Sequence, residues 1–214
     1  MLHVQTFTCN LVQEHTYLVY NDAGDALVID AGFQTEAEQQ DFLDFLNAKN
    51  LRPILALQTH AHFDHIFGAD FLYKTFGLQL RIHPADHALY HYGASQIKRF
   101  MHRDIPLELP PLGPALADEE VIPFGDTSFR ILHTPGHTQG GVCIYNADNA
   151  LLFSGDSLFA GTIGRCDLEG GNLPQLIESL KTKLLLLPDD THVLPGHDRP
   201  TTIGTERKAN PYLQ

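Results

Sequence analysis

Three imidazoles and one carboxylate lie within six consecutive residues, in the sequence His60-Ala61-His62-Phe63-Asp64-His65. Imidazole nitrogen and carboxylate oxygen are the ligands that zinc and non-haem iron prefer. In an extended segment His60 and His62 would point to the same side, and a helix that starts near Asp64 would turn Asp64 and His65 towards a second position. This segment can therefore supply ligands to two neighbouring metal ions, and the alternative is an exposed polar loop that is rich in histidine.

Three further residues of ligand type lie downstream, each next to a glycine. They are His137 in TPGHTQGG, Asp156 in FSGDSLF and His197 in LPGHD. A single histidine often only hydrogen-bonds its surroundings, so none of these residues indicates a metal site when taken alone. Their significance comes from the whole set, because so many candidate ligands at matching positions are not expected by accident.

The elements that must position these residues follow from hydrophobic periodicity. Residues 2–8, 16–20 and 26–32 are predicted strands, and Thr35 with Glu38 forms a capping-box pattern that starts a helix running to about Asn50. An apolar strand at 54–58 leads directly into the histidine segment. Helical spacing of apolar residues follows from residue 69 to residue 76.

The second half of the chain is also predicted to contain strands and a helix. Residues 93–123 carry five prolines, so we expect a long loop with one helical turn there. Strands are predicted at 128–134, 141–146, 150–156 and 191–194, and a helix is predicted from Asn172 to the residues before Pro188. Three of the ligand motifs directly follow a strand, as expected when loops at one end of a sheet build a single site.

Composition restricts the class of protein. The 214 residues include 26 Asp+Glu against 14 Lys+Arg, a formal net charge of −12, which argues against nucleic acid as a partner. Hydrophobic residues at 43% and charged residues at 19% indicate an ordinary globular chain, and we expect residues 1–214 to form a single domain. The three cysteines show no CxxC spacing and no segment is apolar enough for a membrane span or a signal peptide, so we expect a cytoplasmic protein.

The order of these motifs resembles the metallo-β-lactamase superfamily of hydrolases. The resemblance rests on the strand ending at Asp30, the HxHxDH segment, the PGHT turn, the GD strand end and the final PGH turn, and it covers nearly the whole chain. The segments FSGDSLFAGTIGRCDL and PGHDRPTTIGTERKANPYL are similar to the glyoxalase II group, particularly to its short bacterial members. The resemblance implies an α/β fold, a four-layer αββα sandwich of two mixed β-sheets flanked by helices.

The resemblance also implies a ligand set and an activity. Two divalent metal ions are implied, zinc with iron or manganese as other options. His60, His62 and His137 would bind one ion, Asp64, His65 and His197 the second, and Asp156 would bridge them, with Asp64 and Asp156 as catalytic residues. Asp30 would support a ligand histidine through its other ring nitrogen. The implied function is hydrolysis of a small-molecule thioester of the S-2-hydroxyacylglutathione kind by a metal-bound hydroxide.

The sequence departs from the longer glyoxalase II enzymes at its end. Only 17 residues follow His197, so we expect this chain to lack the C-terminal helical domain that supplies basic glutathione-binding residues in those enzymes. Arg165 stands where the family places a basic residue near the substrate, and it is either a partner for a substrate carboxylate or a surface arginine. Cys166 would be a reactive thiol only if its pKa were lowered, and a small buried residue is the favoured interpretation.

Other polar residues are interpreted as structural. His83, His87 and His91 recur every four residues, and an exposed polar face is favoured over a metal site. Glu14, Glu119 and Glu120 are interpreted as solvated surface charges.

Rival functions remain at this point. A mononuclear iron dioxygenase acting on glutathione persulfide has the same fold and would use His60, His137 and Asp156 alone. A non-enzymatic binding protein is disfavoured because no ligand of the seven is lost, and a nuclease is disfavoured because Lys and Arg are not clustered. The oligomeric state is left open.

Overall fold

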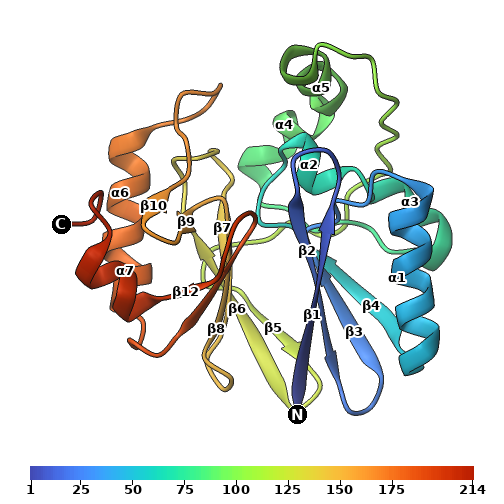
Figure 1. The fold of residues 1–214 in the computed structure, drawn as a ribbon, viewed down its shortest axis with the longest axis horizontal. Coiled ribbons are helices and arrows are strands. Elements are labelled where there is room, and N and C mark those ends of the chain that lie inside the picture. Colours follow the sequence, from blue (N-terminus) through green and yellow to red (C-terminus); the bar gives the residue numbers. More distant parts are fainter. The chain divides into compact units, whose positions relative to one another are not determined.

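A computed structural model describes residues 1–214 and divides them into two compact units. Unit 1 contains residues 1–82 and 87–115, and unit 2 contains residues 83–86 and 116–214. Each unit holds one large β-sheet (Figure 1). That residues 1–214 act as a single domain stays a prediction.

The sheet of unit 1 is mixed. Its strand order is β1-β2-β3-β4, with β1 (Leu2–Cys9), β2 (Glu14–Asn21), β3 (Asp25–Ile29) and β4 (Arg52–Leu57). β1, β2 and β3 pair antiparallel, whereas β3 and β4 pair parallel. A parallel pair needs a crossover, and helix α1 (Glu36–Lys49) supplies it between β3 and β4.

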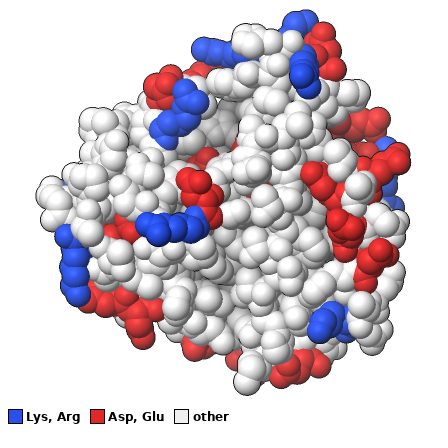
Figure 2. Space-filling model, viewed as in Figure 1, with Lys and Arg blue, Asp and Glu red and all other residues white.

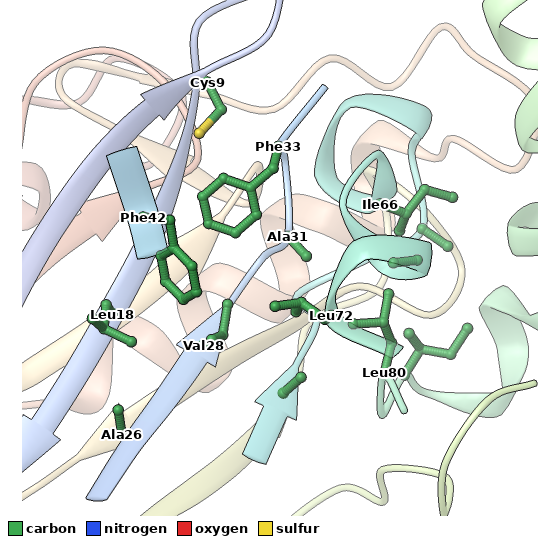
Figure 3. Close-up of a cluster of buried hydrophobic side chains, with 14 of the residues drawn as sticks. Cys9, Leu18, Ala26, Val28, Ala31, Phe33, Phe42, Ile66, Leu72 and Leu80 are labelled. Carbon is green, nitrogen blue, oxygen red and sulfur yellow. The ribbon is translucent and has the colours of Figure 1, made fainter. Parts of the chain in front are cut away.

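The predicted start of α1 is confirmed in detail. The Thr35 hydroxyl accepts from the Glu38 backbone N–H at 3.3 Å, and the Glu38 carboxylate accepts from the Thr35 N–H at 2.8 Å. Asn50 ends the helix in the left-handed conformation. Phe42 and Leu46 form the buried face, and Phe42 packs with Phe33 in the core of the unit (Figure 3).

Unit 1 also contains four shorter helices, which are α2 (Phe63–Ile66), α3 (Ala69–Phe76), α4 (His87–His91) and α5 (Gly93–Met101). The expectation of a long loop at 93–123 was wrong for its first nine residues, which form α5. The five prolines of that stretch all follow residue 105, so none of them interrupts the helix. Gln96 and Ile97 bury its inner face.

The sheet of unit 2 is mixed as well. Its order is β12-β11-β8-β7-β6-β5, with β5 (Val121–Phe124), β6 (Thr127–His133), β7 (Val142–Asn146), β8 (Leu151–Gly155), β11 (His192–Pro195) and β12 (Thr201–Thr202). Only β8 and β11 pair parallel. A small hairpin of β9 (Leu158–Phe159) and β10 (Thr162–Ile163) follows β8.

Two helices and two 3₁₀ turns complete unit 2, namely α6 (Leu173–Thr182), α7 (Ile203–Ala209), η1 (Pro84–Asp86) and η2 (Leu184–Leu186). Asn172 caps α6 by accepting from the Gln175 N–H, as the sequence predicts. Helix α6 ends at Thr182, earlier than predicted, and the 3₁₀ turn η2 follows after Lys183. The guanidinium of Arg207 from α7 then donates to the carbonyls of Leu185 and Leu187.

The C-terminal segment is fixed by one buried carboxylate. Glu206 of α7 accepts from the backbone N–H of Gly161, from the Thr201 hydroxyl and from the Asn210 side chain, at 2.8, 2.6 and 2.8 Å. The ERKANPYL segment therefore has a structural role, because it ties the end of the chain to the β9–β10 turn. None of the helices is both long enough and apolar enough to cross a membrane.

Candidate metal centre

Each predicted ligand lies just after the end of a strand. His60, His62, Asp64 and His65 follow β4 in unit 1. In unit 2, His137 follows β6, Asp156 follows β8 and His197 follows β11. Each unit thus carries part of the predicted ligand set.

Asp30 organises the predicted ligands of unit 1. It lies just after β3 in the left-handed conformation (φ 54°), and its Oδ1 accepts from the Thr59 N–H at 2.7 Å. Its Oδ2 accepts from the Thr59 hydroxyl at 2.7 Å and from Nδ1 of His65 at 3.0 Å. Because a carboxylate oxygen only accepts, Nδ1 of His65 carries the proton and Nε2 is the atom left to bind a metal.

The same carboxylate acts on His60 through Thr59. The Thr59 hydroxyl gives its proton to Asp30, so it accepts at 3.1 Å from Nδ1 of His60. His60 therefore presents Nε2, which lies 3.0 Å from Nδ1 of His62. His60 and His62 are buried, and Nε2 of His60 faces Nδ1 of His62.

Asp64 and His65 lie on α2, the helix that begins one residue after His62. Nε2 of His65 is 3.6 Å from Oδ2 of Asp64. Both side chains are buried. His60 and His62 thus lie before the start of α2, whereas Asp64 and His65 lie within it, and the rings of His60 and His65 approach with their centroids 4.1 Å apart.

Glu14 corrects an expectation, because it is fully buried and is not a solvated surface charge. It lies on β2, its Oε2 accepts from the Thr16 hydroxyl at 3.1 Å, and its Oε1 is 3.7 Å from Nδ1 of His65. Burial raises the pKa of Glu14 well above its ordinary value, although the nearby His65 opposes this. Glu14, Asp30 and His65 form a compact buried group, and no local spacing in the sequence indicates that Glu14 belongs to it.

In unit 2, one oxygen of Asp156 faces two imidazoles. Oδ2 of Asp156 is 3.6 Å from Nε2 of His137 and 3.7 Å from Nε2 of His197. These separations are longer than an ordinary N–H···O hydrogen bond, which is about 2.9 Å.

The imidazole of His137 is oriented by the backbone. Its Nδ1 lies 2.7 Å from the carbonyl oxygen of Arg165, which can only accept, so the proton is on Nδ1 and Nε2 faces Asp156. Because Gly164 has no side chain, the backbone at this position can pass close to both Asp156 and His137. A Cβ at Gly164 would lie 1.8 Å from the carbonyl oxygen of Asp156 and 3.1 Å from Nδ1 of His137.

The turn that carries His137 is held by buried polar groups. Asp86 accepts from the Thr138 hydroxyl at 2.8 Å and from the Gly140 N–H at 2.6 Å. The Thr134 hydroxyl lies 3.0 Å from the Ser157 hydroxyl, which connects the His137 turn to the Asp156 turn. Asp86, Thr134 and Ser157 were not singled out from the sequence, because single polar residues in such positions carry no distinctive spacing.

The donor geometry fits divalent metal ions. Two ligands on one tetrahedral ion, each about 2.0–2.2 Å from the metal, lie about 3.3–3.6 Å apart. The distances of 3.6 Å (His65–Asp64), 3.6 Å (His137–Asp156) and 3.7 Å (His197–Asp156) are close to this value. Three of the imidazoles also have their second nitrogen engaged by an acceptor, as metal-binding histidines usually do.

The side chains of Arg165 and Cys166 differ in their exposure and in their contacts. The Arg165 guanidinium is exposed and donates to both carboxylate oxygens of Asp167 at 2.8 Å. Cys166 is half-buried, its thiol contacts the carbonyl of Gly164, and burial raises its pKa. Cys166 therefore lacks the lowered pKa that a reactive thiol needs.

The second histidine group forms no metal cluster. In unit 2, the ring of His83 stacks on His133 with the ring centroids 3.9 Å apart. In unit 1, His91 is exposed and His87 is half-buried. On the face drawn in Figure 2, Lys and Arg side chains occur at separate places with Asp and Glu among them.

Comparisons with known proteins identify the family of this chain. The model of the Metallo-beta-lactamase superfamily matches residues 9–197. The chain is 36% identical to an uncharacterised protein of Mycobacterium leprae, covering 97% of each chain. It is 32% identical to the hydroxyacylglutathione hydrolase GloC of Haemophilus influenzae, covering 99% of this chain and 98% of GloC. It is 35% identical to the probable metallo-hydrolase YqgX of Bacillus subtilis, covering 94% and 93%.

Solved structures share the fold. The B3 metallo-beta-lactamase BLEG-1 matches with a TM-score of 0.89 at 36% identity, covering 100% of this chain and 99% of that one. TTHA1623 in a di-iron-bound form matches with a TM-score of 0.86 at 38% identity, covering 98% and 100%. ETHE1 from Myxococcus xanthus matches with a TM-score of 0.76 at 26% identity, covering 98% and 83%. The predicted fold class, two mixed sheets with flanking helices, is confirmed.

Proposed function

The chain belongs to the metallo-β-lactamase superfamily, and on that premise we propose that it is a metal-dependent thioesterase acting on S-2-hydroxyacylglutathione-type substrates. The superfamily and the relatives support a metallo-hydrolase. The thioester substrate is the further step of the proposal, and the relative named hydroxyacylglutathione hydrolase supports it.

One observation carries the proposal. Oδ2 of Asp156 is nearly equidistant from Nε2 of His137 and Nε2 of His197, at 3.6 and 3.7 Å. A single carboxylate placed in this way can bridge two cations, each of which also binds one of the two imidazoles. The match to a protein in a di-iron-bound form supports a dinuclear site.

The proposed ligand set has seven members. His60, His62 and His137 hold one ion, Asp64, His65 and His197 hold the other, and Asp156 bridges. Asp30 supports two of these ligands, His65 directly and His60 through Thr59. Zinc is the first candidate for the metal, with iron or manganese as alternatives.

Two bound divalent ions supply a water of lowered pKa and a Lewis acid for the thioester carbonyl. The protein's own residues fix where this happens. Asp30, the Thr59 hydroxyl and the Arg165 carbonyl accept hydrogen bonds from Nδ1 of His65, His60 and His137, respectively. Nε2 is therefore the nitrogen with which each of these rings would bind a metal. A thiolate leaving group has a pKa of about 8.5, so its departure needs no dedicated acid.

Arg165 is the proposed contact for a substrate carboxylate. Its guanidinium is exposed, and its present partner, Asp167, is exposed as well, so exchange of that partner for a substrate carboxylate buries no new charge. All three cysteines are free, and we extend the proposal to a reducing compartment such as the cytoplasm.

The test is thiol release from lactoylglutathione by the metal-loaded protein. Asp156→Ala should abolish both metal binding and turnover. Asp126→Ala, which removes an exposed aspartate of the same unit, should change neither. Turnover retained in the Asp156→Ala variant would overturn the proposal.

The likeness to ETHE1 at 26% identity favours a second candidate, a mononuclear iron persulfide dioxygenase. In that reading His60, His137 and Asp156 hold a single iron ion. Oxygen uptake on glutathione persulfide, with one iron per chain and no thiol release from lactoylglutathione, would support it over the thioesterase.

A further inference from the structure

Helix α5 lies against the segment that carries the histidine motif, although it is about thirty residues further along the chain. Both belong to unit 1, where α5 packs on α2 (Figure 1). Gly93 allows the close approach, because a Cβ there would lie 3.3 Å from Cδ1 of Ile66 and 2.6 Å from Cδ2 of Leu107. At the other end of the helix, the ring of Phe100 stacks on the ring of Phe63.

Between these two contacts, the side chain of Gln96 binds the backbone on both sides of His62. Its Oε1 accepts from the N–H of Phe63 at 3.1 Å, and its Nε2 donates to the carbonyl of Ala61 at 3.2 Å. A second Nε2 bond goes to the carbonyl of Leu89 in α4 at 2.9 Å. Gln96 is 8% exposed, so both of its amide hydrogens and its carbonyl oxygen are used inside the protein.

These bonds act where the chain changes direction. His62 is extended (φ −67°, ψ 149°), the helix with Asp64 and His65 begins at Phe63, and the His62 side chain does not cap it. The first N–H groups of a helix have no partner within the helix, so Gln96 satisfies the donor that marks the start of α2. A shift of this boundary would rotate His62 relative to Asp64 and His65.

We propose that Gln96 is a positioning residue of the metal centre, which fixes His62 relative to the Asp64–His65 pair by holding the backbone at Ala61 and Phe63. The inference rests on the proposed dinuclear site and adds a residue from outside its ligand motifs. An amide is the suitable side chain, because the position needs one acceptor and two donors at once. A carboxylate would meet two carbonyl oxygens, and an apolar side chain would leave the Phe63 N–H without the acceptor that Gln96 gives it and would remove one donor each from the carbonyls of Ala61 and Leu89.

The test compares cobalt(II) binding in Gln96→Met, Gln96→Glu and a matched control. Asn146→Leu is the control, because Asn146 is also a buried amide that donates to a backbone carbonyl, that of Ser128, and accepts from a backbone N–H, that of Asn149, without touching a ligand. Both apolar variants should lose thermal stability. Only Gln96→Met should bind cobalt about 10–100-fold more weakly and show an altered visible absorption spectrum of the bound ion.

Gln96→Glu keeps the acceptor for Phe63 and loses donors, so its cobalt affinity should fall between those of wild type and Gln96→Met. It also keeps the inference testable if Gln96→Met does not fold. Wild-type affinity and spectrum in the Gln96 variants would overturn the inference while leaving the proposed function intact. Failure of the wild-type protein to bind cobalt at all would overturn the metal site, and with it this inference.

Discussion

The Nδ1–H of His137 donates to the backbone carbonyl of Arg165 at 2.7 Å, so the residue at position 165 acts on the site through its main chain. The guanidinium of the same residue is turned to solvent and pairs with Asp167. Arg165 thus has two separable connections to the site, an observed backbone contact with the proposed ligand His137 and a proposed side-chain contact with substrate.

Gly164 is expected to tolerate no side chain, since a Cβ would overlap the carbonyl of Asp156 and press on His137. We expect Gly164→Ala to weaken zinc binding about 10–100-fold, because it displaces two ligands together. Gly161→Ala is the control. Gly161 has a left-handed backbone (φ +77°) but nothing within 4 Å of its Cβ position, so that variant should lose about 1 kcal/mol of stability and keep its zinc affinity. Zinc competition titrations measure both, and equal affinities in the two variants would contradict the role given to Gly164.

Asp86 should support the His137 turn. Asp86→Ala leaves the Thr138 hydroxyl and the Gly140 N–H buried without their acceptor, which costs about 2–4 kcal/mol of unfolding free energy. We also expect weaker zinc binding. Asp118→Ala, which loses bonds to the His133 N–H and to Lys183 in the same unit, should leave zinc affinity unchanged. Urea denaturation and zinc titration test the pair, and unaltered zinc affinity in Asp86→Ala would count against the assignment.

Glu14 should make stability fall as pH rises. Its pKa is raised in the folded chain by burial, so between its ordinary value of 4.5 and the raised value the folded chain holds a proton that the unfolded chain releases. The free energy of unfolding therefore decreases with rising pH over this range. Glu14→Gln removes this dependence and should be the more stable protein at pH 8. Unfolding of the metal-free proteins at pH 5 and pH 8 measures it, and a parallel pH dependence in both would refute the prediction.

Arg165 and Asp167 should act in opposite directions on substrate binding. If the guanidinium binds a substrate carboxylate, Asp167 competes for it, so Arg165→Gln should raise KM for lactoylglutathione about tenfold and Asp167→Asn should lower it. The kcat values should stay within about twofold. Steady-state kinetics of both variants provide the test, and a KM unchanged by Arg165→Gln would return Arg165 to the role of a surface residue.

The sequence predicted those parts of the fold and site that have local signals. The capping box at Thr35 and the strands before each motif are set by neighbouring residues, and the structure confirms them. The family and fold class followed from the order of the motifs. Glu14, Asp86 and Gln96 were not predicted as site supports, because each acts on backbone or side chains that are far away in the sequence or on another strand. Helix α5 was missed since its short amphipathic pattern precedes a proline-rich stretch.

The central claim is that Asp156 bridges two metal ions that serve thioester hydrolysis. The most direct test is elemental analysis of the purified protein, expressed without metal supplements, together with an anaerobic assay of thiol release from lactoylglutathione. We predict about two divalent metal ions per chain and thiol release without oxygen, with both lost in Asp156→Ala. One iron per chain, no thiol release and oxygen uptake on glutathione persulfide would contradict this account.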